Sequence, residues 1–264
     1  MKYFLHIGYN GSNYHGWQSQ PNAITVQGVI EEKLACIFKT DITVFGCGRT
    51  DAGVHASQYF LNITINNELD FDLKFRLNKH LPNDIVVYDV IEVKERQHAR
   101  YDATSRTYDY FIHLQKDPVL GKYSSYYELK NLDFEAMKKA ADLIPLYDNF
   151  EAVCKQPDLH NHTICHVTHA KLYVNTTQLR MRFNITANRF LRGMIRILVG
   201  HLLKVGTGDL SLEDFESILS KQQLLTDKKP AFSNGLYLSG ISYPYIKVNQ
   251  PTNICSFLKT GLTY

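Results

Sequence analysis

The chain shows one order of predicted strands and helices twice, and this repetition constrains its fold more than any other feature. In the first half, β-branched and aromatic runs predict strands, and apolar residues spaced as on a helix face predict helices. Thr25 can cap the first helix, and the turn Leu81-Pro82-Asn83-Asp84 ends the second. The predicted elements, in the order β-α-β-β-α-β, cover residues 3–9, 26–38, 42–47, 56–65, 71–80 and 85–93.

The second half repeats this order. Asp133 can cap its first helix, which Pro145 bounds. Gly206 and Gly208 can end its long second helix, and Ser211-Leu-Glu-Asp214 resembles a capping box for one more short helix. The predicted elements cover residues 103–114, 133–143, 167–174, 179–186, 189–204 and 236–243.

Two split β-α-β units are typical of ferredoxin-like and RRM-like folds. We therefore predict an α+β protein of two tandem ferredoxin-like units, with antiparallel sheets packed around a central basic cleft. The predicted domains are residues 1–102 and 103–264. No low-complexity segment or flexible linker separates them, so we expect the halves to pack together.

Bulk properties permit a nucleic-acid partner without requiring one. The hydrophobic content of 44% and charged content of 21% predict a globular protein, and the formal charge of +3 is only mildly basic. The five cysteines form no CxxC pair, which favours a reduced, cytoplasmic protein. The apolar run at the N-terminus is too short for a signal peptide, and no stretch has the length of a membrane span.

The segment Gly48–Ala56, GRTDAGVHA, joins two predicted strands and carries a candidate site. Its glycines allow a close approach of backbone to a ligand, and catalytic groups concentrate on such connections. Asp51 can serve as a nucleophile, a base or a metal ligand, with Arg49 beside it. The alternative is an ordinary turn that contains a local Arg–Asp pair.

The predicted helix at residues 189–204, RFLRGMIRILVGHLLK, contains three arginines and no acid. On a helix, Arg189, Arg192 and Arg196 lie within about 60° of one face. The first two would lie in the first turn, where the helix dipole disfavours cations. Their partner is therefore a carboxylate from elsewhere, a phosphate, or only water, as on a solvated basic face.

Two further patterns are less specific. Tyr108 and Tyr110 share one face of a predicted strand and Asp109 takes the other, so the tyrosines either stack on RNA bases or are half-buried sheet residues. The segment His160–His169 holds four histidines and Cys165, which suggests a zinc site, but its spacing matches no common one.

Together these motifs resemble the TruA family of tRNA pseudouridine synthases over essentially the whole chain. The segment Gly48–Ala56 is similar to the family's catalytic box. Further similar motifs follow in the family's order: Tyr9–Gln18, His98–Arg100, Arg106–Tyr110, Phe190–Arg196 and Gly235–Leu238.

The resemblance implies a tRNA-modifying isomerase that works as a homodimer, without metal or organic cofactor, on uridines at positions 38, 39 and 40 in the anticodon arm. It implies that Asp51 is the nucleophile that attacks a flipped-out uridine and that Arg196 pairs with it. Tyr108 would stack on the base and is a candidate to remove the C5 proton, while Leu236 would contact the base. Arg49 would assist base flipping.

Substrate phosphates would bind to remaining cations, Arg189 and Arg192 among them. Two departures from the family are visible, Thr107 in place of a second basic residue and the His-rich segment. Two other functions stay open: a non-catalytic RNA-binding module of the same fold, and a metal-dependent hydrolase centred on residues 160–169.

Overall fold

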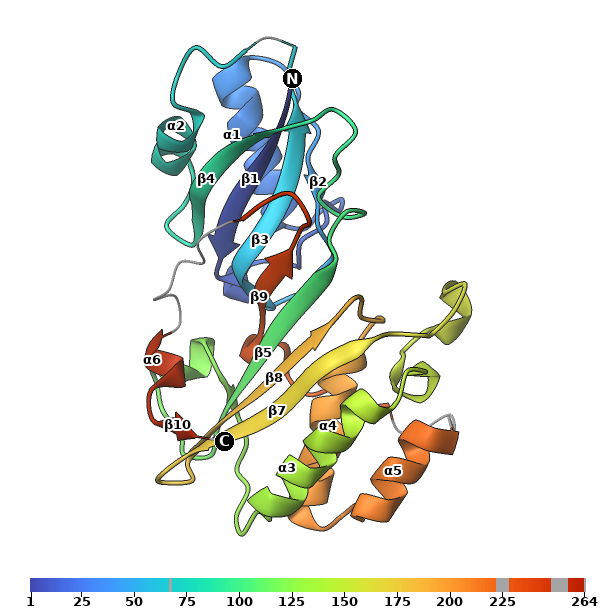
Figure 1. Ribbon diagram of the computed structural model, residues 1–264. Helices are drawn as coiled ribbons and strands as arrows, with labels where there is room; N and C mark the ends of the chain where they lie inside the picture. Colours follow the sequence, from blue (N-terminus) through green and yellow to red (C-terminus); the bar gives the residue numbers. More distant parts are fainter. Residues whose placement is uncertain (67, 222–227, 248–255, 264) are drawn as a thin grey trace. The chain divides into compact units, whose positions relative to one another are not determined.

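The computed structural model describes residues 1–66, 68–221, 228–247 and 256–263 (Figure 1). The chain divides into two compact units, each of which combines a largely antiparallel sheet with helices, in agreement with the predicted α+β class. Unit 1 comprises Met1–Thr104 and Tyr237–Ile254, and unit 2 comprises Ser105–Leu236 and Cys255–Tyr264. The segment Tyr237–Ile254, placed by sequence in the second domain, thus clusters with the first half of the chain.

Unit 1 contains the predicted order of strands and helices. Its elements are β1 (Lys2–Tyr9), the short helix η1 (Gly11–Asn13), α1 (Val26–Phe38), β2 (Phe45–Gly46), β3 (His55–Thr64), α2 (Leu73–His80), β4 (Ile85–Val93) and, from Tyr237 onward, β9 (Leu236–Ser242). The strands follow the order β9-β3-β1-β4, and β2 also pairs with β3. Among the strand pairs of the described part of this unit, β3 and β9 run parallel and the others run antiparallel.

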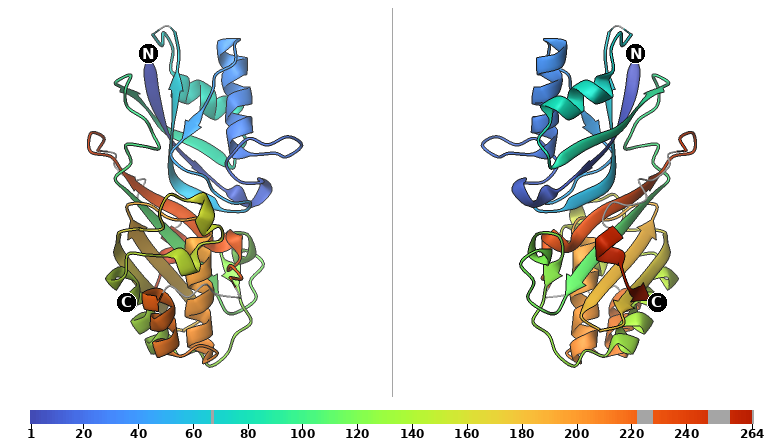
Figure 2. Two further views of the ribbon diagram at one scale, coloured as in Figure 1. Left: turned by 90° about the vertical axis from the view of Figure 1, so that its right-hand side faces the viewer. Right: turned by 90° about the vertical axis from the view of Figure 1, so that its left-hand side faces the viewer.

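Local signals explain the two helices of unit 1. The side chain of Thr25 accepts a hydrogen bond from the amide of Gly28 and so caps α1. The buried positions Val26, Ile30 and Leu34 then form the apolar stripe that faces the sheet. Both helices lie on the same face of the unit 1 sheet (Figure 2).

The strand predicted at residues 42–47 is much shorter in the structure, because side chains of α1 hydrogen-bond to the backbone of Val44. The amide of Val44 donates to Oε1 of Glu31 at 3.1 Å, and its carbonyl accepts from Nε2 of Gln27 at 3.2 Å. Both polar groups of Val44 are therefore satisfied by helix side chains, and only Phe45–Gly46 pairs with β3.

Apart from the last predicted strand, which is β9 and belongs to unit 1 from Tyr237 onward, unit 2 contains the elements predicted for the second half and additional short ones. They are β5 (Ser105–His113), η2 (Leu120–Lys122), β6 (Ser125–Tyr126), α3 (Phe134–Leu143), η3 (Ile144–Leu146), η4 (Glu151–Val153), η5 (Pro157–Leu159), β7 (Val167–Asn175), β8 (Arg180–Ala187), α4 (Met194–Thr207), α5 (Leu212–Lys221), η6 (Ser233–Gly235), α6 (Ser256–Lys259) and β10 (Leu262–Thr263). The strand order is β10-β7-β8-β5, with β6 parallel to β5. Helices α3, α4 and α5 cover one face of this sheet (Figure 1). No helix in the described ranges is long and apolar enough to cross a membrane.

The arginine-rich helix begins later than predicted. Helix α4 starts at Met194, and the preceding Gly193 has a φ of +75°, a left-handed conformation that interrupts the helix. A Cβ at Gly193 would also lie 2.9 Å from Cγ of Lys155, so tertiary packing favours glycine here. Arg189 and Arg192 therefore precede the helix, and the predicted dipole conflict does not arise for them.

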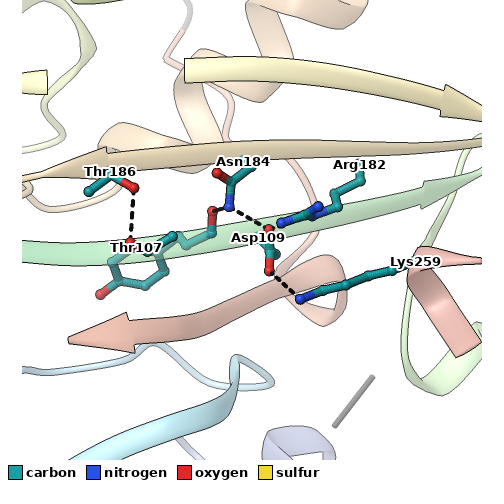
Figure 3. A network of polar contacts seen from close by, with 7 residues as sticks. Thr107, Asp109, Arg182, Asn184, Thr186 and Lys259 are labelled. Carbon is teal, nitrogen blue, oxygen red and sulfur yellow. Dashed lines mark hydrogen bonds and ion pairs between the residues drawn. The ribbon is translucent and has the colours of Figure 1, made fainter. Parts of the chain in front are cut away.

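A buried carboxylate organises the face of the unit 2 sheet opposite Tyr108 and Tyr110 (Figure 3). Asp109 is 1% exposed, and its Oδ1 accepts hydrogen bonds from Nε of Arg182 at 2.6 Å and Nδ2 of Asn184 at 2.7 Å. Nζ of Lys259, in α6, lies 3.5 Å from Oδ2. The contacts make Asp109 the link between β5, β8 and α6.

We expect Asp109→Ala to lower the free energy of unfolding by about 3 kcal/mol, because it leaves Arg182 without its buried partner. Lys259→Ala should cost less than about 1 kcal/mol, since that side chain is 41% exposed and its ion pair is long. Urea unfolding followed by circular dichroism measures both changes. Equal, small losses in the two variants would contradict the central role of Asp109.

Candidate active site

In unit 1 the loop Gly48–Ala56 is held by the N-terminal segment that follows β1. The amide of Trp17 donates to the carbonyl of Thr50 at 3.1 Å, and the amide of Gly53 donates to the carbonyl of Tyr14 at 3.2 Å. The hydroxyls of Tyr9 and Thr50 are 2.9 Å apart and hydrogen-bonded. The two motifs thus form one unit of local structure, although about thirty residues of chain separate them.

Glycine is required where these backbones touch. Gly16 has a φ of +90°, and a Cβ there would lie 2.5 Å from the carbonyl oxygen of Thr50. At Gly11, a Cβ would lie 2.0 Å from the carbonyl oxygen of Val54. Within the loop, Gly53 turns the chain with a φ of +76°. A side chain at Gly11 or Gly16 would therefore displace the loop.

Three aromatic side chains form the floor of the loop. Trp17 stacks on Tyr59 with ring centroids 4.1 Å apart, and Tyr9 meets Tyr59 edge to face at 5.6 Å. All three are buried. The hydroxyl of Tyr59 donates to the carbonyl of Gly48 at 2.6 Å, so the floor fixes the start of the loop as well.

Further contacts anchor the ends of this arrangement. Nδ1 of His55 accepts from the amide of Gly11 at 3.1 Å, and the ring of His55 stacks on Tyr237 at 4.4 Å. The hydroxyl of Tyr14 donates to Asp84 at 2.6 Å. Burial and this bond raise the pKa of Tyr14, so its hydroxyl stays protonated and keeps donating even in alkaline solution where an ordinary tyrosine ionises. On this frame Arg49 and Asp51 are both exposed.

In unit 2, the two tyrosines of β5 have different surroundings. Tyr108 is half-buried and meets Phe190 edge to face, with centroids 5.1 Å apart. Tyr110 is 1% exposed, and its hydroxyl bonds with the carbonyl of Phe232 at 2.7 Å and with Oγ of Ser125 at 2.9 Å. Burial raises the pKa of Tyr110 well above its usual value. Tyr110 is therefore a core residue, whereas Tyr108 is partly exposed.

Arg196 is attached to the segment that leads into β9. Its Nε donates to the carbonyl of Ala231 at 2.7 Å, and the amide of Ala231 donates back to the carbonyl of Arg196 at 2.9 Å. Further along, a Cβ at Gly235 would lie 2.5 Å from the carbonyl oxygen of Phe111, so this segment packs directly on β5. Leu236 follows and is 7% exposed. One short segment thus connects Arg196, Leu236 and the strand of Tyr108.

Arg189 and Arg192 have neutral partners. Nη1 of Arg189 lies 3.1 Å from Nε2 of His162, and Nη1 of Arg192 donates to Oε1 of Gln156. The first contact joins Arg189 to the His-rich segment, and the second joins Arg192 to the loop ahead of that segment.

The part of the chain that the structure describes contains no set of ligands for the zinc ion suggested by the sequence. No group of three or more His, Cys, Asp or Glu side chains there could hold a metal ion. Cys154 and Cys165 are buried free thiols, and burial raises the pKa of Cys165 to about 11, which disfavours the thiolate that binds zinc. Cys255 lies outside the described residues.

The predicted site residues are thus divided between the units. Asp51 and Arg49 belong to unit 1, and the other predicted residues belong to unit 2: Tyr108, Arg189, Arg192, Arg196 and Leu236. The pairing of Asp51 with Arg196 remains a prediction. Sequence reasoning missed the structural role of Gly11 and Gly16, for which two glycines between aromatic residues were the available signal.

Comparison with known proteins gives one consistent result. The sequence model of a family described as tRNA pseudouridine synthase matches residues 6–102 and 147–244. The chain is 41% identical to tRNA pseudouridine synthase A of Porphyromonas gingivalis and to that of Bacteroides fragilis, each over 92% of this chain and 97% of the relative. It is 33% identical to the protein of the same name from Acetivibrio thermocellus, over 90% of this chain and 98% of the relative.

We expect Gly16→Ala to lower the free energy of unfolding by about 1–3 kcal/mol, because it combines a positive φ with a clash against Thr50. Gly48→Ala is the matched control in the same region, since a Cβ at Gly48 meets nothing within 4 Å. That variant should stay within about 0.5 kcal/mol of the parent protein. Thermal or urea unfolding measures both, and an unchanged stability in Gly16→Ala would contradict the packing described.

Proposed function

The chain belongs to the tRNA pseudouridine synthase family, and we propose from this premise that it converts uridine to pseudouridine in the anticodon stem-loop of tRNA. It is an isomerase that acts on tRNA. The observation that carries the mechanism is the exposed Asp51 on a loop whose backbone is fixed by Gly11, Gly16 and the aromatic floor. A carboxylate on such a fixed loop is suited to nucleophilic attack.

Isomerisation requires the base to leave the sugar and return by another atom. The bond between N1 and C1′ breaks, a bond between C5 and C1′ forms, and a proton leaves C5 while N1 gains one. Asp51 attacks either C1′ of the ribose or C6 of the uracil and is released at the end. The atoms balance without an oxidant or a group donor, so the proposal includes no cofactor.

A stacked uridine cannot reach a carboxylate, so the nucleotide must first be flipped out of the stem. Arg49, two residues from Asp51, assists this step. Tyr108, which is partly exposed, then stacks on the extruded base and is the candidate to remove the C5 proton. Leu236 provides an apolar contact to the base.

Arg196 is proposed to pair with Asp51 when the enzyme acts, which keeps the carboxylate ionised and aimed. The bond of Nε to the carbonyl of Ala231 supports this role, because it holds the guanidinium in one place. Arg189 and Arg192 bind substrate phosphates.

The finer parts of the proposal concern sites and assembly. The target uridines are those at tRNA positions 38, 39 and 40, and the enzyme works as a homodimer in the cytoplasm. Two tandem ferredoxin-like domains, divided near residue 102, supply the two halves of the catalytic set.

The test of the whole proposal is incubation with unmodified tRNA, followed by position-resolved mapping of pseudouridine. Pseudouridine outside the anticodon arm, or none, would contradict it.

Asp51→Asn should abolish pseudouridine formation while tRNA affinity stays within a few-fold, because an amide is not a nucleophile but keeps the same shape. Turnover and binding to unmodified tRNA are measured on the same preparation. Retained turnover would refute the nucleophile. The alternative that the fold is a non-catalytic RNA-binding module would be favoured instead if the parent protein bound tRNA but formed no pseudouridine.

Arg196→Ala should lower kcat by about 100-fold or more, with a change in tRNA affinity of less than about 5-fold, since the lost contact orients the carboxylate. Single-turnover kinetics separates the two quantities. An equal loss in both would identify Arg196 as a phosphate contact instead.

A further inference from the structure

A group of cations lies where the loop before β7 meets the segment before α4, and neutral groups hold it in place. The group consists of Lys155, Arg189, Arg192 and Lys228, which we call the unit 2 cation group. One backbone contact joins two of its members, since the amide of Lys155 donates to the carbonyl of Arg192 at 3.0 Å. The stem of Lys155 also packs against Gly193.

Each of the other three cations bonds to an uncharged acceptor. Nζ of Lys228 donates to the carbonyl of Cys154 at 2.8 Å, next in sequence to Lys155. Arg189 contacts the imidazole of His162, and Arg192 contacts the amide of Gln156. Because the guanidinium of Arg189 can only donate, Nε2 of His162 accepts and its ring is neutral in this arrangement.

Acids are present nearby but do not neutralise the group. Glu151 and Asp158 belong to the same loop. Among the described residues, neither forms an ion pair with any of the four cations. Other cations of unit 2 differ in this respect, since each of them has a carboxylate partner: Lys138, Lys171 and Arg182.

The choice of neutral partners has a consequence for ligand binding. A carboxylate would orient a guanidinium equally well but would cancel its charge and compete with an anion. An amide or a neutral imidazole orients it and leaves the charge in place. Each guanidinium has five N–H donors, and Arg189 and Arg192 each use one in these contacts.

We propose that the unit 2 cation group binds backbone phosphates of the substrate RNA and that Gln156 and His162 are positioning residues for its two guanidiniums. This proposal rests on the proposed function and extends it to Lys155, Lys228 and the His-rich loop. It gives that loop a role in substrate affinity rather than in metal binding.

The sharpest test replaces a neutral partner by a charged one of the same shape. Gln156→Glu preserves the contact with Arg192 and adds a negative charge, so we expect KM for unmodified tRNA to rise about 3- to 10-fold with kcat unchanged. Gln115→Glu, the same change on an exposed residue beyond the far end of β5, is the control and should leave KM unchanged. An unchanged KM in Gln156→Glu, with unfolding like that of the parent, would overturn the proposal.

His162 allows the complementary comparison. His162→Gln supplies a neutral acceptor and should stay within about 2-fold of the parent in KM, whereas His162→Glu should weaken RNA binding as Gln156→Glu does. Equal effects of both variants would mean that the imidazole only supports the fold of the loop and would overturn its role as a positioning residue.

The cations themselves are tested through salt dependence. Arg189→Gln combined with Arg192→Gln should reduce the slope of log affinity against log salt concentration by about 1.5–2, measured by fluorescence anisotropy with labelled tRNA. Lys138→Gln on α3 is the control. An unchanged slope would overturn the proposal. Because this measurement needs no turnover, it is separate from the proposed function, whose own failure appears as absent pseudouridine in the parent enzyme.

Discussion

The close approach of two backbone segments in unit 1 is the constraint on which the proposed chemistry depends. Gly11 and Gly16 let the N-terminal segment lie directly against the carbonyls of Thr50 and Val54. Neither contact would exist with a Cβ in place. The result is that the loop with Asp51 is shaped by the fold and needs no ligand to hold it, as preorganised catalytic groups require.

Charge is used in two different ways in unit 2. At Asp109 a carboxylate and its cationic partners are buried together, and the pairing serves the sheet. At Arg189 and Arg192 the partners are neutral and lie at the surface, so the charge stays available. The same residue type, arginine, therefore has a structural role in one place and a proposed binding role in the other, and the identity of the partner distinguishes them.

Much of the fold could be predicted because its signals are local. The caps Thr25 and Asp133 fixed two helix starts that the structure confirms. Two of the errors have tertiary causes. The predicted strand at residues 42–47 is shortened because side chains of α1 bond to its backbone at Val44. The helix predicted from Arg189 begins only after Gly193, against which Lys155 packs. Most candidate residues stood out from local sequence patterns, and the family resemblance supplied their roles and added Leu236. Lys155 and Lys228 carry no motif and were identified only through their contacts in the structure.

The way the Asp51 loop is held also bears on how such a site can diverge. The bonds from Trp17 and to Tyr14 end on main-chain atoms of the loop, as does the bond from Tyr59 to Gly48. A hydrogen bond to a main-chain atom does not depend on which side chain that residue carries. Residues 49 and 51 can therefore change in evolution while the curve of the loop persists. A homologous protein that had lost the carboxylate at position 51 would then keep the conformation of this loop but not the catalytic reaction.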